Sequence, residues 1–348
     1  MAQGHGDRSG AALALASAAL FGASTPLAKL LIGEISPWLL AGLLYLGSGI
    51  GLALLARILP STEEKLARAD LPWLSAVIAT GGILGPVLLM LGLRTTPAAS
   101  AALLLNLEGV FTLAIAWIVF RENVDLRIGL GAAAILAGAV VLSAGGPVGR
   151  VGWGAGAIAL ACLAWAIDNN LTRKLSSADP VQIAMIKGLA AGSVNIVLAL
   201  LLQVTWPPAW AVGAAGIVGF LGYGVSLALF VHALRHLGAA RTTAYFSAAP
   251  FVGAFIAIVG LGEPLSLSFL VAAPLVAIGL YLHLAERHEH PHQHEPLTHA
   301  HRHVHDTHHQ HGHAAADPPG EPHTHTHAHA RLVHQHPHFP DIHHRHVH

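Results

Sequence analysis

Long apolar runs constrain this chain more than any other feature. Ten runs are each long enough, at about 20 residues, to cross the hydrocarbon core of a bilayer. They lie at 11–32, 37–59, 72–93, 97–119, 126–144, 152–171, 180–203, 210–233, 239–261 and 266–285. Many connections between them are short, such as IGEIS at 32–36 and RENVD at 121–125. The sequence therefore predicts an all-α membrane protein of ten transmembrane helices, with no soluble domain between them.

The first run has an alternative interpretation as a secretory signal peptide. Arg8 precedes it, and Ala23 and Ser24 are small enough for a peptidase site. However, the run continues past Ser24 to Ile32, and nine more apolar runs follow. We therefore expect an uncleaved first transmembrane helix.

The distribution of Lys and Arg predicts the orientation of the bundle. If the N-terminus is cytoplasmic, eleven basic residues outside the apolar centres lie on the cytoplasmic side and three lie on the other. The eleven are Arg8, Arg57, Lys65, Arg68, Arg121, Arg127, Arg173, Lys174, Arg235, Arg241 and Arg287, and the three are Lys29, Arg94 and Arg150. Because cytoplasmic loops carry the excess of Lys and Arg, we expect an inner-membrane protein with both termini in the cytoplasm.

The chain also matches itself. At an offset of 141, the segment 93–123 aligns with 234–264 and pairs Arg94 with Arg235 and Glu122 with Glu263. At an offset of 145, the segment 14–31 aligns with 159–176 and pairs Lys29 with Lys174. The body therefore reads as two five-helix units, 11–145 and 152–285. Because five is odd, the second unit enters the membrane in the opposite sense, an inverted repeat that suits alternating access.

The arrangement resembles the drug/metabolite transporter superfamily, and its EamA-type repeat in particular. The resemblance is carried by FGASTPLAK at 21–29, NLEGVFTLAIAWIVFREN at 106–123, GAAAILAGAVVL at 131–142, WAIDNNLTRKL at 165–175 and SAAPFVGAFIAIVGLGEPLS at 247–266. It implies a ten-helix secondary transporter that moves a small polar organic solute outward across the inner membrane. The coupling that we expect is to protons or to exchange. The partners are the solute and membrane lipid, with a homodimer as an allowed assembly.

Charged residues inside apolar runs are candidates for function, because each one costs free energy in a bilayer. Lys187 lies seven residues into its run, about 10 Å from the helix end, where it would pair with a carboxylate or with an anionic solute. A snorkelling lysine or a purely structural ion pair is the alternative. Glu108 lies near the middle of its run and is a candidate proton-exchange site, a neutral structural residue, or the partner of Lys187.

Asp168 is a competing proton site, although it could also be solvated at a helix end near Arg173 and Lys174. The remaining candidates for solute binding are amides and tyrosines, whose hydroxyls could donate hydrogen bonds to a polar solute or could simply pack. They are Asn106, Asn169, Tyr45, Tyr223 and Tyr245. Glu122 and Glu263 lie at helix ends, where a capping role is favoured over solute contact.

Composition excludes other classes of function. The 18 basic and 18 acidic residues cancel, so the chain has no overall basic field for nucleic acid. The sequence has neither a phosphate-binding glycine-rich loop followed by Lys and Ser or Thr nor a zinc-helix motif. We therefore expect no enzyme activity and no required cofactor.

The C-terminal segment 288–348 is chemically different from the body. It holds 23 of the 27 histidines and has almost no apolar content, which predicts a disordered cytoplasmic tail. Imidazole is a ligand for Zn, Ni and Co, so the tail is a candidate metal-binding segment. Its candidate ligands are His290, His292, His294, His301, His303, His305, His309, His311, His313, His325, His327 and His329.

The tail leaves two rival functions open. One is a transition-metal transporter that exports cytoplasmic ions captured by the tail. Against it, the predicted spans lack a convergent set of His, Asp and Glu ligands. The other is a non-transporting membrane protein that senses metal through its tail.

Overall fold

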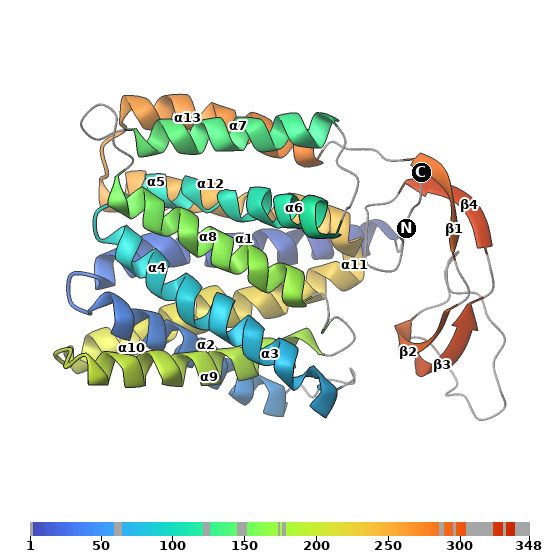
Figure 1. Ribbon diagram of the computed structural model, residues 1–348, viewed down its shortest axis with the longest axis horizontal. Helices are drawn as coiled ribbons and strands as arrows, with labels where there is room; N and C mark the ends of the chain where they lie inside the picture. Colours follow the sequence, from blue (N-terminus) through green and yellow to red (C-terminus); the bar gives the residue numbers. More distant parts are fainter. Residues whose placement is uncertain are drawn as a thin grey trace.

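The computed structural model is a bundle of helices that lie side by side, with their axes roughly horizontal in Figure 1. It describes residues 3–58, 65–120, 126–144, 152–172, 175, 179–284, 289–294, 297–303, 323–329 and 332–337. We call the end of the bundle where α1 begins the N-terminal end, and the other end the opposite end. The helical body confirms the predicted all-α membrane fold.

The first half of the body contains five crossings of the bundle. Two of them are single helices at the start, two are interrupted, and the fifth is again a single helix. The elements are α1 (Gln3–Leu31), α2 (Pro37–Ile58), the short 3₁₀ turn η1 (Arg68–Asp70), α3 (Leu71–Val77), the π-helix η2 (Ile78–Leu84), α4 (Gly85–Leu93), α5 (Ala98–Leu104), α6 (Leu107–Phe120) and α7 (Leu126–Ser143).

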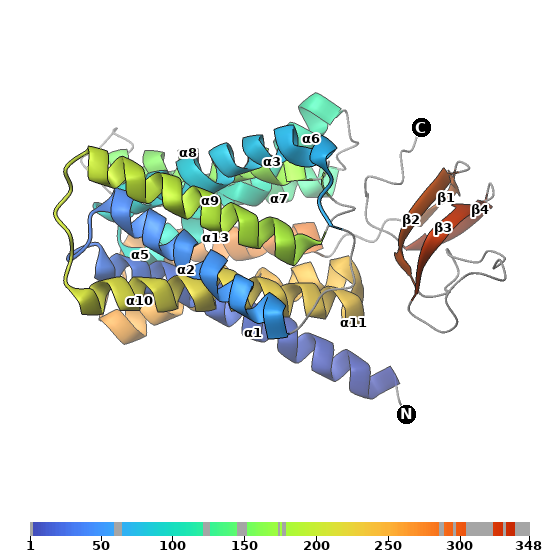
Figure 2. The ribbon, with the colours of Figure 1, turned by 90° about the horizontal axis from the view of Figure 1, so that it is seen from below.

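The second half repeats this plan. Its elements are α8 (Trp153–Thr172), α9 (Pro180–Leu201), α10 (Ala209–Gly219), the π-helix η4 (Phe220–Val225), α11 (Ser226–Phe246), α12 (Ala249–Phe255), the π-helix η5 (Ile256–Gly260) and α13 (Leu267–Leu284). Seen from below, the crossings of both halves run roughly along the same direction (Figure 2).

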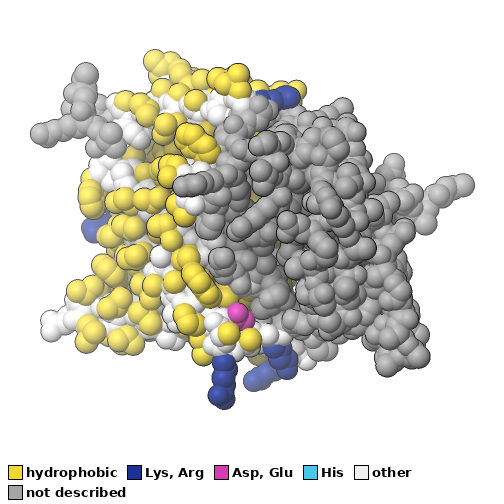
Figure 3. Space-filling model, turned by 45° about the vertical axis from the view of Figure 1, so that its right-hand side comes forward, with side chains coloured by type: hydrophobic (Ala, Val, Ile, Leu, Met, Phe, Trp, Pro, Cys, Tyr) yellow, Lys and Arg dark blue, Asp and Glu magenta, His cyan; other side chains and the backbone are white. Residues whose placement is uncertain are grey.

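Eight helices in the described part of the chain are long and apolar enough to span a membrane. They are Ser9–Leu31, Pro37–Ile58, Arg68–Leu93, Ala98–Val119, Leu126–Ser143, Pro180–Leu201, Ala209–Ala233 and Arg241–Gly260, and Leu267–Leu282 is a shorter apolar helix. The remaining predicted span, the sixth, is α8, which packs within the same bundle but carries Asp168, Asn169 and Asn170. Hydrophobic side chains cover much of the described surface in Figure 3, as expected of a face in contact with lipid.

The helix contacts follow the inverted repeat. We number the crossings in chain order, from the first (α1) to the tenth (α13). The second crossing packs on the seventh (α2 on α9), and the fifth packs on the tenth (α7 on α13). The third crossing packs on the sixth (α4 on α8). The equivalent contact with the two halves exchanged joins the eighth crossing to the first (η4 and α11 on α1). Exchanging the two halves therefore leaves this set of contacts unchanged, as a pseudo-two-fold relation requires.

Both halves also interrupt their helices at equivalent places. Adding the sequence offset of 141 to η2 (78–84) gives 219–225, which matches η4. The break between α5 and α6, at 105–106, corresponds within one residue to the break between α11 and α12, at 247–248. Broken helices at matching depth in two repeats often mark a transport site.

Glycines allow α2 and α9 to pack closely against each other. A Cβ on Gly192 would lie 2.5 Å from the backbone nitrogen of Leu46, and one on Gly188 would lie 2.8 Å from the carbonyl oxygen of Tyr45. Small residues with this spacing let two backbones approach inside a membrane, where packing rather than water drives association.

Replacing Gly192 by alanine is expected to destabilise the protein by about 1–3 kcal/mol, because the added methyl group has no space. Gly156 on α8 provides the matched control, since a Cβ there meets nothing within 4 Å. The apparent Tm in detergent should fall for Gly192→Ala and stay unchanged for Gly156→Ala. Equal Tm values for the two variants would contradict the packing described here.

Two charged side chains hold the corner between α4 and α5 at the opposite end of the bundle. The Lys29 ammonium on α1 donates hydrogen bonds to the carbonyl oxygens of Leu93 and Thr96. The Glu263 carboxylate accepts hydrogen bonds from the amides of Ala98 and Ala99, at 2.7 and 2.9 Å. We call Lys29 and Glu263 the corner clamp.

The corner clamp places a cation at the end of α4 and an anion at the start of α5, as the helix dipoles favour. It also confirms that Glu263 caps a helix. The repeat counterparts of the two clamp residues, Lys174 and Glu122, lie outside the described residues.

The structure describes four short strands in the histidine-rich tail. They are β1 (Glu289–His294), β2 (Leu297–His303), β3 (His323–His329) and β4 (Leu332–Pro337). β1 pairs antiparallel with β4, and β2 pairs antiparallel with β3. The alternating sequence of the tail has the two-residue period of a strand, and backbone pairing itself needs no apolar content.

Candidate functional site

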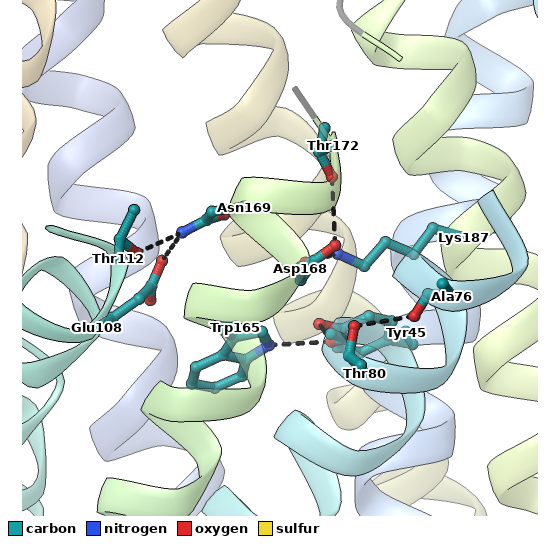
Figure 4. Close-up of polar contacts among 11 residues, drawn as sticks. Tyr45, Ala76, Thr80, Glu108, Thr112, Trp165, Asp168, Asn169, Thr172 and Lys187 are labelled. Atoms are coloured by element: carbon teal, nitrogen blue, oxygen red, sulfur yellow. Dashed lines mark hydrogen bonds and ion pairs between the residues drawn. The ribbon is translucent and has the colours of Figure 1, made fainter. Parts of the chain in front are cut away.

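Polar side chains from four elements meet around the last turns of α8. Asp168 and Asn169 are neighbours in sequence but point to different sides of this helix, Asp168 toward Lys187 on α9 and Asn169 toward Glu108 on α6 (Figure 4). We call the following set the polar cluster: Tyr45, Gly81, Glu108, Thr112, Trp165, Asp168, Asn169 and Lys187. It joins helices of both repeats.

Lys187 and Asp168 form an ion pair through a direct hydrogen bond between Nζ and Oδ2. Their side chains are only 18% and 6% exposed, so neither lies on an open surface. Thr172, one turn further along α8, donates a hydrogen bond of 3.3 Å to the other carboxylate oxygen of Asp168. The structure therefore supports the ion-pair interpretation of Lys187 over snorkelling, and its partner is Asp168 rather than Glu108.

Glu108 has neutral partners. Asn169 Nδ2 donates a hydrogen bond of 2.8 Å to Glu108 Oε1 and also lies 3.5 Å from the hydroxyl oxygen of Thr112. Glu108 is partly buried, whereas Asn169 is exposed. The carboxyl group of Glu108 is therefore oriented by the amide of Asn169.

The π-helix η2 supplies backbone acceptors to the cluster. The Gly81 carbonyl accepts hydrogen bonds from the Tyr45 hydroxyl at 2.8 Å and from the Trp165 indole nitrogen at 2.9 Å. The Gly82 carbonyl accepts a hydrogen bond of 3.3 Å from Asn195 on α9. A π-helix disturbs the regular pairing of backbone groups, and here side chains from α2, α8 and α9 satisfy two of its carbonyls.

Gly81 has no room for a side chain. A Cβ at this position would lie 2.0 Å from Asp168 Oδ2, so the glycine is what allows the carboxylate to reach Lys187. Gly81→Ala is therefore expected to displace Asp168, lower the Tm and reduce solute uptake. Gly129→Ala on α7 is the control, because a Cβ there meets nothing within 4 Å. Uptake by Gly81→Ala at the level of the control would show that this geometry is unnecessary.

The structure places the other predicted residues as follows. Asn106 is buried in the break between α5 and α6, where its side chain donates to the Leu103 carbonyl at 2.9 Å. Tyr223 lies in η4, and its ring centroid is 5.8 Å from that of Tyr45 and 5.9 Å from that of Phe21. Tyr245 is 38% exposed on α11, and among the described residues no hydrogen bond joins it to the polar cluster.

Four residues in or next to the polar cluster were not predicted from the sequence or had no predicted role: Gly81, Thr112, Trp165 and Thr172. A threonine or tryptophan in an apolar helix is ordinary, so its side chain gives no signal until its neighbours are known. Only the paired glycines of TGG at 80–82, which weaken a regular helix, could have indicated an irregular segment.

The described residues contain no group of three His, Cys, Asp or Glu side chains arranged to hold a metal ion. Of the predicted tail ligands, His305, His309, His311 and His313 lie outside the described residues. The others lie on β1, β2 and β3, namely His290, His292, His294, His301, His303, His325, His327 and His329.

An inverted repeat of apolar helices with a polar cluster between its halves is typical of membrane transport proteins. The profile of the EamA-like transporter family matches residues 8–144 and 152–285, so the chain belongs to that family. An uncharacterized transporter of Methanothermobacter thermautotrophicus is 27% identical over 283 residues, which are 75% of this chain and 82% of the relative.

A solved crystal structure has the same fold, with a TM-score of 0.59 at 19% identity. The match covers 78% of this chain and 96% of the solved one. The family assignment confirms the predicted membrane transporter and makes small molecules and lipid its natural partners.

Proposed function

We propose that this protein is a secondary transporter that carries a small polar organic solute past the polar cluster by alternating access. The observation that carries the proposal is the position of the cluster. Lys187, Asp168 and Asn169 from the second repeat meet Tyr45, Gly81 and Glu108 from the first. Relative movement of the repeats therefore changes the exposure of these groups first to one side of the membrane and then to the other.

The interrupted helices support this movement. The segments η2 and η4 lie at equivalent positions, and each contains two glycines. The corner clamp would hold the opposite end of the bundle closed in this conformation.

Glu108 is the proposed proton site. A carboxylate among apolar helices is costly when it is charged, so it binds either a proton or a positive partner. In the described structure its hydrogen-bond partner is the neutral amide of Asn169. Proton release from Glu108 on one side of the membrane and uptake on the other would couple solute movement to the proton gradient.

The direction and location are proposed from the positive-inside pattern and from the family. With eleven basic residues on one side, we place both termini in the cytoplasm of an inner-membrane protein. The outward direction of transport is proposed from the resemblance to the drug/metabolite transporter superfamily alone. Reporter fusions at residue 150 and at the C-terminus test this orientation, since only the first should become active outside the cytoplasm.

Transport is tested with the full-length protein reconstituted in liposomes that face a metabolite mixture and a pH gradient. Mass spectrometry of the lumen should show a few compounds enriched over protein-free liposomes. Collapse of the pH gradient with a protonophore should reduce this enrichment. If no compound is enriched in either condition, the transporter proposal is wrong.

The histidine tail supports a second proposal, binding of Zn, Ni or Co. The segment holds 23 histidines, and backbone pairing of β2 with β3 sets His299, His301 and His303 opposite His327, His325 and His323. Full-length protein should bind more than one Ni ion in equilibrium dialysis, and a chain truncated after Arg287 should bind none. Equal binding would exclude the tail as the ligand source.

A physiological metal role, by transport or by sensing, requires more than this binding. Cells with the full-length protein, the truncated protein or neither should then differ in their tolerance of Ni, Co or Zn. Equal tolerance in all three would leave solute transport as the function.

A further inference from the structure

The charge balance of the polar cluster identifies the kind of solute. The cluster contains three side chains of the Lys, Asp or Glu type: Lys187, Asp168 and Glu108. Lys187 and Asp168 neutralise each other in their ion pair. Glu108 is bonded to the amide of Asn169, and no cation pairs with it among the described residues. One carboxylate is therefore left to be neutralised by an occupant of the site.

The same balance disfavours an anionic solute. Lys187 is the only basic side chain of the cluster, and its ammonium is already engaged by Asp168. An anion would have to displace that carboxylate in a poorly hydrated setting, and it would also approach the like charge of Glu108. A cation needs no such rearrangement, because Asn169 is exposed and can turn away from Glu108.

The aromatic side chains beside the cluster provide a matching surface. The Tyr45 hydroxyl already donates a hydrogen bond to the Gly81 carbonyl, so Tyr45 can offer a solute its aromatic ring but no free donor. The rings of Tyr45 and Tyr223 lie 5.8 Å apart and come from different repeats. Tyr45 also lies close enough to Glu108 to interact with it electrostatically. Aromatic faces attract organic cations, whereas tyrosine hydroxyls would have favoured a neutral polar solute.

From these observations we infer that the solute is an organic monocation, which binds at Glu108 in exchange for one proton. The inference rests on the proposed transport function and deepens it. The proton leaves the Glu108 carboxyl group when the cation binds, and a proton from the other side later displaces the cation. One positive charge moves in each direction, so the cycle transfers no net charge across the membrane.

The test uses full-length protein in liposomes that contain a trapped pH dye. Three probes of similar size are added outside: benzyltrimethylammonium as a permanent cation, benzenesulfonate as a permanent anion and benzamide as a neutral compound. Benzyltrimethylammonium should make the lumen more alkaline, as protons leave in exchange, and the other two should not. An imposed potassium diffusion potential should leave the rate unchanged, because the exchange is electroneutral.

Two variants make the test specific. Glu108→Gln should abolish the proton movement completely, and Glu108→Asp should retain part of it. Glu34→Gln is the matched control, because Glu34 is an exposed carboxylate in the turn after α1. Size-exclusion profiles of the purified variants should match that of the unmodified protein.

Several results would overturn the inference. These are the absence of any response to the cation, a response to benzenesulfonate or benzamide alone, or an undiminished response in Glu108→Gln. Its failure is separate from that of the proposed function, because the metabolite-mixture assay detects solutes of any charge. If that assay shows uptake of neutral or anionic compounds, transport stands and the cation assignment is wrong.

Discussion

Replacing Lys187 by alanine is expected to abolish solute uptake and to lower the free energy of unfolding by about 3–5 kcal/mol. The reason is that Asp168, whose side chain is 6% exposed, would keep its charge and lose its cation. The Asp168 carboxylate binds Lys187 on α9 and lies next to Gly81 in η2. Movement of this carboxylate should therefore also disturb the hydrogen bonds of Trp165 and Asn169 on the same helix. Uptake in liposomes and denaturation in detergent measure the two effects.

A double variant separates the loss of a partner from the loss of a charge. Lys187→Met combined with Asp168→Leu removes both charges and fills similar volume, so the unfolding free energy should return toward its original value. Uptake should recover in part, because the role of the pair is to position α8, whereas Glu108 is the group that binds the charged solute. Lys65→Ala, at an exposed lysine outside the cluster, should change neither quantity. Normal uptake by Lys187→Ala would contradict the role of the pair.

Replacing Glu108 by glutamine is expected to abolish proton-driven uptake while leaving the protein folded. Glutamine has nearly the same shape and keeps an oxygen that can accept the hydrogen bond from Asn169. It cannot bind and release a proton, so a pH gradient can no longer drive the cycle. Uptake should be measured with and without a gradient across the liposome membrane.

The Tm of Glu108→Gln should equal or exceed that of the unmodified protein, because a group that is costly to ionise has been removed from the bundle. A lower Tm would assign Glu108 a structural role. Proton-driven uptake at the original rate would show that the coupling site lies elsewhere, with Asp168 as the next candidate.

The sequence predicted the fold more completely than the site. Apolar runs and matching charges at helix ends are local signals, so they revealed ten spans and two inverted units without knowledge of any contact. A capping or topology role of Glu263 was likewise predicted from its position at a helix end, but the tertiary structure alone decided that it caps α5 of the other repeat. The interruptions at η2 and η4 were not predicted, since a π-helix depends on how its neighbours pack.

Pairing inside the site could not be read from the sequence. Asp168 and Asn169 are adjacent, yet consecutive helical residues point about 100° apart. One therefore meets Lys187 and the other meets Glu108. The sequence left open whether Glu108 pairs with Lys187, because the choice depends on which faces of α6, α8 and α9 meet. Tyr245 was predicted with the other tyrosines but lies on an exposed face of α11.

The sequence by itself determined that this chain is a membrane bundle of two inverted five-helix units with a histidine-rich tail. The first physical reason is that long apolar runs are excluded from water and enter the bilayer. The second is that each unit has an odd number of spans, so the second unit enters the membrane in the opposite sense to the first. The tertiary structure alone decided which charges neutralise each other. Partner choice among buried charges depends on helix rotation and on glycines such as Gly81 that make room for a carboxylate. That choice leaves Glu108 without a cation among the described residues, and it is the basis for the solute proposed here.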